Sequence, residues 1–199
     1  MSAYVIGLTG GISTGKSNLS SALKKAGAKI IDADEISRSL TAPGGEALPL
    51  IRQAFGDRVF EGDILNRRAL GELVFGNEEN RKILNDIVHP LVFQKMKDEI
   101  AASHEPVILD VPLLFECGMD SWCDEIWCAY LPQKMQVKRL MARDGLSYRQ
   151  AMNRIHSQMP TLEKAKKSHR VIRTTGSREE SAAIVLSLWR ETLQKLNAQ

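Results

Sequence analysis

The sequence Gly-Gly-Ile-Ser-Thr-Gly-Lys-Ser at residues 10–17 decides the fold of this chain of 199 residues. It matches the pattern G-x-x-x-x-G-K-[ST] at every fixed position, follows an apolar run at 4–8 and precedes a helical pattern that Gly27 ends. This context fits the motif, because glycines let backbone N–H groups wrap around phosphate oxygens and a helix N-terminus adds a favourable dipole. The stretch therefore predicts a nucleoside triphosphate site, with Lys16 on the terminal phosphates and Ser17 on Mg²⁺.

Short apolar runs predict a parallel sheet around this motif. A strand, a turn, a helix and a second strand follow one another within residues 4–33, which implies a right-handed crossover. The runs expected to form strands lie at 4–8, 28–33, 107–111, 126–130 and 171–174. We expect an α/β fold, the three-layer core of a P-loop NTPase with a five-stranded parallel sheet.

The chain between the second and third strands is longer than a crossover needs. A crossover takes about a dozen residues, whereas residues 37–103 are largely helical in pattern, with turns and Pro90 as interruptions. Helix-like spacing occurs at 68–75, 81–88 and 91–100. We predict a single domain over 1–199 with a helical substrate subdomain inserted at 37–103.

A basic helical segment follows the fourth predicted strand. Arg139 and Arg143 are four residues apart and share a helical face, and a capping box is expected at 147–150. Across 131–176 the sequence has 11 basic and 2 acidic residues, although the net charge of the whole chain is only +3. Two interpretations are open: a solvated charged face, or a lid at 132–160 whose arginines stabilise the charge of a transferred phosphoryl group.

The P-loop alone does not say what happens to the nucleotide. The sequence has no N-K-x-D motif, which a G-protein would use to bind its base. The predicted strand at 107–111 carries one acid, Asp110, where a motor ATPase would have two adjacent acids. Because no second acid is placed to activate water, the sequence favours a kinase that passes the phosphoryl group to a small-molecule acceptor.

Two acids follow the second predicted strand, at the sheet edge where ligands of open α/β sheets gather. Asp32 and Asp34 would point to the same side of an extended segment. One of them would then orient the acceptor hydroxyl and accept its proton. The other interpretation, that Asp34 caps a helix beginning near Glu35, stays open on spacing alone.

Composition places the chain in a reducing, water-soluble setting. Cys117, Cys123 and Cys128 fit neither a zinc-ligand pattern nor a paired disulfide framework, so we expect buried thiols. No signal peptide and no membrane span is recognisable. We expect a cytoplasmic protein that binds neither membrane nor nucleic acid, and a monomer is compatible with the sequence.

Several motifs in a fixed order resemble the dephospho-coenzyme A kinase family over nearly the whole chain. They are IGLTGG at 6–11, GKS at 15–17, IDAD at 31–34, LNR at 65–67, HP at 89–90, LDVPLLFE at 109–116, Arg139-Leu140 with Arg143, and Arg154 with Gln158. The P-loop is shared by many families, whereas the D-A-D, H-P and D-V-P-L-L-F-E segments at these distances are far more specific.

The resemblance implies transfer of the ATP γ-phosphoryl to the ribose 3′-hydroxyl of dephospho-coenzyme A, with Mg²⁺, giving coenzyme A. It implies that residues 37–103 bind the coenzyme A moiety and that 132–160 form the lid. Expected catalytic residues are Asp34, Lys16, Arg139 and Arg143. Expected ATP-binding residues are Gly11, Ile12, Ser13, Thr14, Gly15, Lys16, Ser17, Asn18 and Thr174. Expected substrate-binding residues are Asp34, Arg67, His89 and Leu113, and those near the metal are Ser17, Asp32 and Asp110.

The chain departs from the family pattern at two positions. Thr174 stands where the family commonly has Asn, which exchanges an amide that donates and accepts for a single hydroxyl and puts adenine selection in question. Asn18 replaces a frequent Thr, with little effect expected. The sequence leaves two alternative functions: a nucleoside or nucleotide kinase of the same fold, and a nucleotide-gated RNA-binding module.

Overall fold

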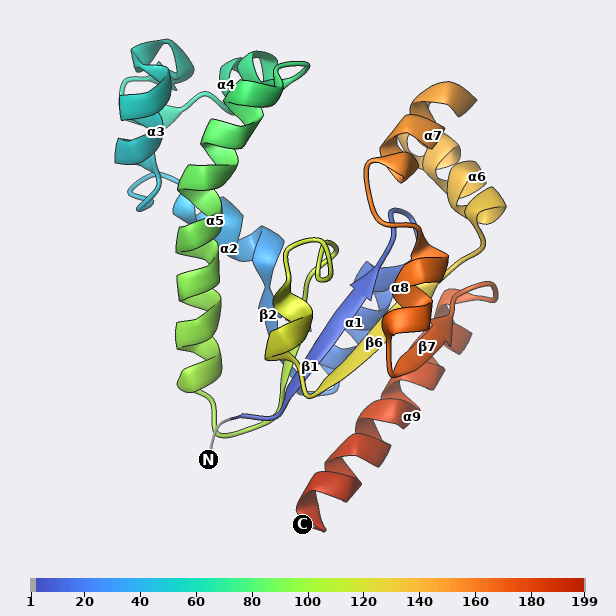
Figure 1. Cartoon of the computed structure of the whole chain (residues 1–199). Coiled ribbons are helices and arrows are strands. Elements are labelled where there is room, and N and C mark those ends of the chain that lie inside the picture. Colours follow the sequence, from blue (N-terminus) through green and yellow to red (C-terminus); the bar gives the residue numbers. More distant parts are fainter. Residues whose placement is uncertain (1–2, 199) are drawn as a thin grey trace. The chain divides into compact units, whose positions relative to one another are not determined.

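The computed structural model describes residues 3–198 and divides the chain into two compact units. The first unit combines the chain up to Ile31 with the chain from Ser103 onward, and the second unit is Asp32–Ala102. The second unit, largely helical in Figure 1, is therefore an insertion between two parts of the first.

The first unit is organised around a five-stranded sheet with β1 at its centre. Its strands are β1 (Val5–Gly10), β2 (Lys29–Asp32), β5 (Val107–Asp110), β6 (Glu125–Tyr130) and β7 (Arg170–Arg173), in the order β2-β5-β1-β6-β7. β1 pairs in parallel with β5 and β6, and β6 pairs in parallel with β7. The predicted five-stranded parallel sheet is confirmed, and every strand end lies within about two residues of its expected place.

Helices cover both faces of this sheet. α1 (Lys16–Lys25) and α9 (Arg178–Asn197) pack against each other, and α8 (Thr161–Lys167) packs over β1 and β6 on the other side of the sheet (Figure 1). A short 3₁₀ helix, η2 (Met119–Trp122), precedes β6. These elements form the expected three layers of a P-loop core.

Residues of β1 alternate between the two faces. Ile6 and Leu8 are buried in one core with Leu23 of α1 and Trp189 of α9. Gly7 faces the opposite layer, where an added Cβ would lie only 2.9 Å from Leu114. Burial on both faces is typical of a parallel strand and explains why β1 is continuously buried.

The segment at 132–160 folds as a pair of helices within the first unit. They are α6 (Gln133–Asp144) and α7 (Tyr148–His156), joined at Gly145, whose φ of 66° suits glycine. The contacts between them are made by Val137, Leu140, Ala151 and Ile155. The predicted capping box is confirmed at Ser147, which begins α7.

The second unit contains helices and one small hairpin. Its elements are α2 (Ala33–Leu40), α3 (Leu48–Phe55), the 3₁₀ helix η1 (Asp57–Val59), β3 (Phe60–Glu61), β4 (Ile64–Leu65), α4 (Arg67–Val74) and α5 (Glu78–Ala101). The antiparallel hairpin of β3 and β4 was not expected. Two-residue strands are too short to show alternation, so only the turn at Gly62 (φ 60°) signalled them.

The helices expected at 81–88 and 91–100 form one helix, α5, so the predicted break at Pro90 is wrong. Proline removes one N–H and crowds the carbonyl four residues earlier, here that of Asp86. Packing of α5 against α2, α3 and α4 outweighs this local cost, with Val88, Val92 and Met96 buried. Although α5 has 24 residues, no helix within residues 3–198 is both long and apolar enough to cross a membrane.

The three cysteines are free thiols, but only Cys128 is fully buried. Burial raises the pKa of Cys128 to about 11 and that of Cys123 to about 12. Both groups are therefore protonated at neutral pH and poorly reactive.

Replacing Pro90 by alanine should stabilise the chain. Position 90 is exposed, and alanine restores the N–H without a clash. The gain of about 3 kcal/mol in helix propensity is reduced by about 1 kcal/mol, because proline also restricts the unfolded chain. We expect the free energy of unfolding, measured in urea, to rise by about 2 kcal/mol.

The exposed change Lys82→Ala in the same helix is the control and should alter the free energy of unfolding by less than about 0.5 kcal/mol. A Pro90→Ala variant no more stable than the parent chain would show that Pro90 itself contributes to the packing of α5.

Candidate active site

The P-loop connects the end of β1 to the start of α1. Gly15, the residue before α1, has a φ of 88°, which only glycine adopts freely. Ser13 has a φ of 59°, the only positive φ at a non-glycine position within residues 3–198, and its buried Oγ has no partner there. Strain and an unpaired polar atom are typical of a preformed site. The first N–H groups of α1 have no intrahelical acceptor and suit a phosphate.

Three side chains from outside the P-loop contact its first turn. The Ile12 N–H donates to Gln158 Oε1 at 3.1 Å. A Cβ added to Gly11 would overlap Oγ1 of Thr161, and the same Cβ would lie 3.2 Å from Gln136 Oε1. Gln136 Nε2 in turn donates to Thr161 Oγ1 at 2.9 Å. Gly11 is therefore required by a close approach, and the P-loop is held by both ends of the 132–160 segment.

Lys16 and Asp110 form an ion pair between the P-loop and β5. The side chain of Asp110 is 3% exposed, at the last residue of its strand. Ser17 follows Lys16 and is exposed in the first turn of α1. The structure thus brings three predicted residues together, with a basic group and oxygen donors beside the helix N-terminus.

Oxygen atoms at this place fit Mg²⁺ as P-loop proteins bind it. Mg²⁺ prefers oxygen ligands and usually takes only one or two from the protein, the rest coming from water and phosphates. Ser17 and Asp110 supply such oxygens, and Asp110 is buried with a cation as its present partner. Within residues 3–198 no group of three or more His, Cys, Asp or Glu side chains is placed to hold a metal without such help.

Asp32 and Asp34 do not lie in one extended segment, so the expected alternation is wrong. α2 begins at Ala33, directly after Asp32. The Asp32 side chain accepts the N–H groups of Asp34 and Glu35 at 2.8 and 3.0 Å, so Asp32, and not Asp34, is the N-cap. Asp34 is exposed in the first turn of α2. Capping of α2 therefore does not account for the acid at position 34.

Thr174 is buried next to the P-loop. Its hydroxyl donates to the carbonyl of Thr14 at 2.5 Å, and its own carbonyl accepts from Arg139 Nη2 at 2.8 Å. A hydroxyl has one proton to donate. Because the Thr14 carbonyl accepts that proton, the Thr174 side chain holds the P-loop and does not present a donor to the nucleotide base. Asn18, at the other predicted departure, donates to the carbonyl of Arg178 at 2.9 Å.

The two lid arginines have different surroundings. Arg139 lies next to the P-loop, with Nη1 at 3.8 Å from the point where a Gly15 Cβ would be. Arg143 pairs with Asp144 at 2.7 Å, and Arg154 pairs with the same carboxylate at 2.7 Å. Hydrogen bonding to Arg143 lowers the pKa of Asp144. The structure brings Arg139, but not Arg143, to the P-loop.

The second unit has its own open cavity, of about 290 Å³. Ser37, Arg67, Leu70, Val88 and His89 are among its lining residues. Arg67 Nη2 donates to Thr41 Oγ1 at 3.0 Å, and the His89 ring stacks on Phe93 at 5.8 Å. Two predicted substrate residues, Arg67 and His89, therefore share one cavity, which is lined by both polar and apolar side chains. Leu113, another predicted substrate residue, belongs to the first unit and is 37% exposed.

Sequence reasoning missed Gln136 and Thr161, which contact the P-loop. Both stand in regions of ordinary helical composition, and α8 itself was not expected. Gln158 appeared only through the family resemblance. No local pattern marks such residues, because their contacts join segments more than a hundred residues apart.

A P-loop between the central strand and the first helix of a parallel sheet places the protein in the P-loop NTPase class. The structure superposes on TT1252 from Thermus thermophilus with a TM-score of 0.80, at 33% identity over 96% of this chain and 98% of that one. The TM-score with a dephospho-CoA kinase from Campylobacter jejuni is 0.71, at 25% identity over 95% and 97% of the two chains.

The chain belongs to the dephospho-CoA kinase family, whose model matches residues 4–180. A dephospho-CoA kinase from Geobacillus kaustophilus is 43% identical over 192 residues, which cover 94% of this chain and 95% of that protein. The resemblance inferred from the motifs is confirmed. Dephospho-CoA kinase activity, an ATP-dependent phosphotransfer, follows from this membership.

Thr174→Val tests whether the Thr174 hydroxyl holds the P-loop. The change leaves the Thr14 carbonyl without this donor, which costs about 1–3 kcal/mol for a buried group. We expect the Kd for ATP, measured by calorimetry, to rise about fivefold or more. Thr175→Val, at the exposed neighbour, should leave the Kd unchanged. Equal affinities in the two variants would contradict this role for Thr174.

Proposed function

We propose that this chain transfers the γ-phosphoryl group of ATP to the ribose 3′-hydroxyl of dephospho-coenzyme A, giving coenzyme A and ADP. The observation that carries the proposal is the pairing of Lys16 with Asp110 beside Ser17, in a chain of the dephospho-CoA kinase family. This arrangement supplies the phosphate side and the metal side of a phosphoryl-transfer site at one place.

ATP binds along the P-loop in this proposal. Backbone N–H groups of the loop and of the first turn of α1 surround the phosphates, and Lys16 leaves Asp110 to contact the terminal phosphates. The residues involved are Gly11, Ile12, Ser13, Thr14, Gly15, Lys16, Ser17 and Asn18. Thr174 acts through Thr14, by the hydrogen bond that fixes the loop.

Ser17 and Asp110 would hold Mg²⁺, which would supply positive charge to offset the charge of the ATP phosphates. Release of Lys16 from Asp110 frees the carboxylate for this role and the ammonium for phosphate. Asp32 caps α2 with the carboxylate oxygen Oδ1, which leaves Oδ2 for a contact through water.

The arginines of α6 stabilise the charge of the transferred group. Arg139 is already beside Gly15 and needs little movement. Arg143 must leave Asp144, or reach the phosphate while still paired. The pair of helices at 132–160 acts as the lid and excludes water that would hydrolyse ATP.

The second unit binds the coenzyme A moiety, corresponding to the subdomain expected at 37–103. Its cavity combines an arginine and a histidine with apolar side chains, which suits a ligand with phosphate groups and an apolar chain. Arg67 and His89 contact the acceptor there, and Leu113 is a further residue assigned to the acceptor. Asp34, exposed and free of any capping role, orients the acceptor hydroxyl and accepts its proton.

Acceptor specificity is the direct test of the function. Incubation with Mg²⁺ and ATP should convert dephospho-coenzyme A into coenzyme A with equal amounts of ADP, measured by chromatography. Turnover of a nucleoside or nucleoside monophosphate in its place would favour a nucleotide kinase. RNA affinity with a steep salt dependence, and no kinase product, would favour the RNA-binding module. The cytoplasmic location stays a prediction.

Asp34→Asn should remove most of the turnover. An amide keeps the shape of the side chain but accepts no proton, so we expect kcat to fall by about 10²-fold or more. The Kd for ATP should stay within about twofold, because Asp34 is not assigned to the nucleotide. Glu35→Gln, a neighbouring exposed carboxylate on α2, is the matched control and should retain kcat. Undiminished turnover in Asp34→Asn would exclude Asp34 as the base.

A further inference from the structure

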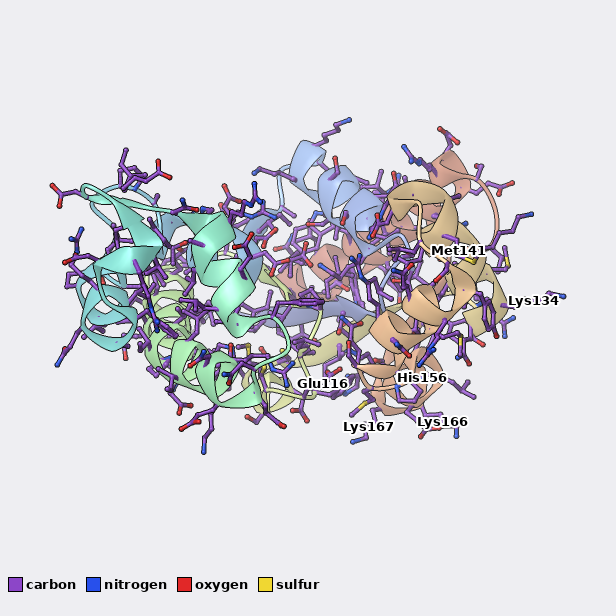
Figure 2. All side chains as sticks on the ribbon, turned by 90° about the horizontal axis from the view of Figure 1, so that it is seen from above. Glu116, Lys134, Met141, His156, Lys166 and Lys167 are labelled. Carbon is purple, nitrogen blue, oxygen red and sulfur yellow. The ribbon has the colours of Figure 1, made fainter. Side chains whose placement is uncertain are left out.

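Lys164 of α8 carries a buried charge that the reaction proposed above does not use. Its side chain is 0% exposed. Lys166 and Lys167 of the same helix are exposed and reach the outer surface of the first unit (Figure 2). Burying an ammonium group is costly unless it is paired and hydrogen-bonded.

The Lys164 ammonium joins both ends of the turn that follows β5. Nζ donates to the carbonyl of Pro112 at 2.6 Å and pairs with Glu116 Oε1 at 2.8 Å. The same Oε1 accepts the N–H of Met159 at 2.9 Å. The Glu116 side chain is only 23% exposed, so water weakly screens the pair. We call these four groups the Lys164 bridge.

The Lys164 bridge is connected both to the strand that leads into the P-loop and to the segment that carries Asp110. The Pro112 carbonyl also accepts from Thr9 Oγ1 at 3.2 Å, and Thr9 directly precedes the P-loop residues 10–17. Asp110, the acid at the end of β5, lies two residues before Pro112. One carbonyl is therefore shared by β1, α8 and the segment that carries Asp110.

The same part of the chain also contacts the P-loop directly. Gln158, next to Met159 of the bridge, accepts the Ile12 N–H, and Thr161 of α8 lies against Gly11. Residues 158–164 thus contact the P-loop on one side and the turn after Asp110 on the other. A movement of α8 would change the spacing between these two segments.

We propose that Lys164 and Glu116 are positioning residues for phosphoryl transfer, which hold Asp110 at a fixed spacing from Lys16 and Ser17. The proposal rests on the proposed function, because it uses the assignment of Asp110 to the metal side. A buried ion pair is a poor source of net stability, since apolar replacements are often equally stable. Its directional, charge-assisted hydrogen bonds are well suited to fixing geometry.

Lys164→Met tests this role, because methionine has a similar length and no charge. Calorimetry gives the Kd for ADP with and without Mg²⁺. The Kd without Mg²⁺ divided by the Kd with Mg²⁺ reports how much the metal site contributes to binding. We expect this ratio to fall about tenfold, as is usual when a partner that orients a metal ligand is removed. The Kd for ADP without Mg²⁺ should change by less than about threefold, because the P-loop is intact.

The kinetic expectation is equally specific. In Lys164→Met, kcat should fall about tenfold or more, while the KM for dephospho-coenzyme A stays within about twofold. Lys166→Met is the matched control: it removes an exposed lysine of the same helix, one that pairs with Glu163 at 2.8 Å. Its Mg²⁺-dependent ratio and its kcat should equal those of the parent chain.

Glu116→Gln supplies a second, milder variant that decides the question if Lys164→Met does not fold. Glutamine keeps an oxygen for the Met159 N–H and removes only the charge. We expect a smaller fall of the Mg²⁺-dependent ratio, and no further fall when Lys164→Met is combined with it, since the two residues act as one unit. Unchanged ratios in both single variants, or strictly additive effects, would overturn the proposal.

ADP binding needs no acceptor, so the two proposals fail in different ways. A parent chain that makes no coenzyme A would contradict the proposed function and leave the calorimetric result valid. A parent chain that makes coenzyme A, with Lys164→Met unaffected in binding and turnover, would show that the bridge serves only to hold α8 on the sheet.

Discussion

The parallel pairing of β1 with β5 is the constraint on which the nucleotide site depends. This register places Asp110 opposite Leu8, two residues before the P-loop, and the burial of β1 on both faces leaves the strand no freedom to slip. Lys16 reaches Asp110 because the hydrogen-bonded pairing of β1 with β5 fixes the positions of both residues. The positions of α1, of the turn after β5 and of α8 follow from this pair of strands.

Much of the first unit could be predicted from the sequence because its signals are local. Buried parallel strands are short apolar runs, and the P-loop combines a fixed spacing with a strand before it and a helix after it. The hairpin of β3 and β4 and the continuous α5 gave no such signal. Pro90 is a local helix breaker, and only the packing of Val88, Val92 and Met96 in the folded unit outweighs it.

The candidate site divides in the same way. Lys16, Ser17 and Asp110 were predicted from motifs, whereas Gln136, Thr161 and Lys164 act through contacts that exist only after the chain has folded. Asp32 and Asp34 fall between these cases: the acids were found, but which of them caps α2 depends on where the helix begins. That choice, one or two residues wide, is the least predictable property of a helix.

The imbalance of charge across 131–176 has a consequence for the energetics of the empty protein. Its two acids, Asp144 and Glu163, pair with basic residues of the segment, and Glu116, Glu125 and Glu191 from outside it pair with Lys164 and Arg170. Only part of the net charge of +9 (11 minus 2) is therefore compensated, and the rest is left to mutual repulsion. ATP relieves this repulsion and is therefore the counterion of the segment as well as a substrate. By mass action, the folded population grows with nucleotide concentration. A cell short of ATP would hold this protein in its least stable form, the one most open to proteases.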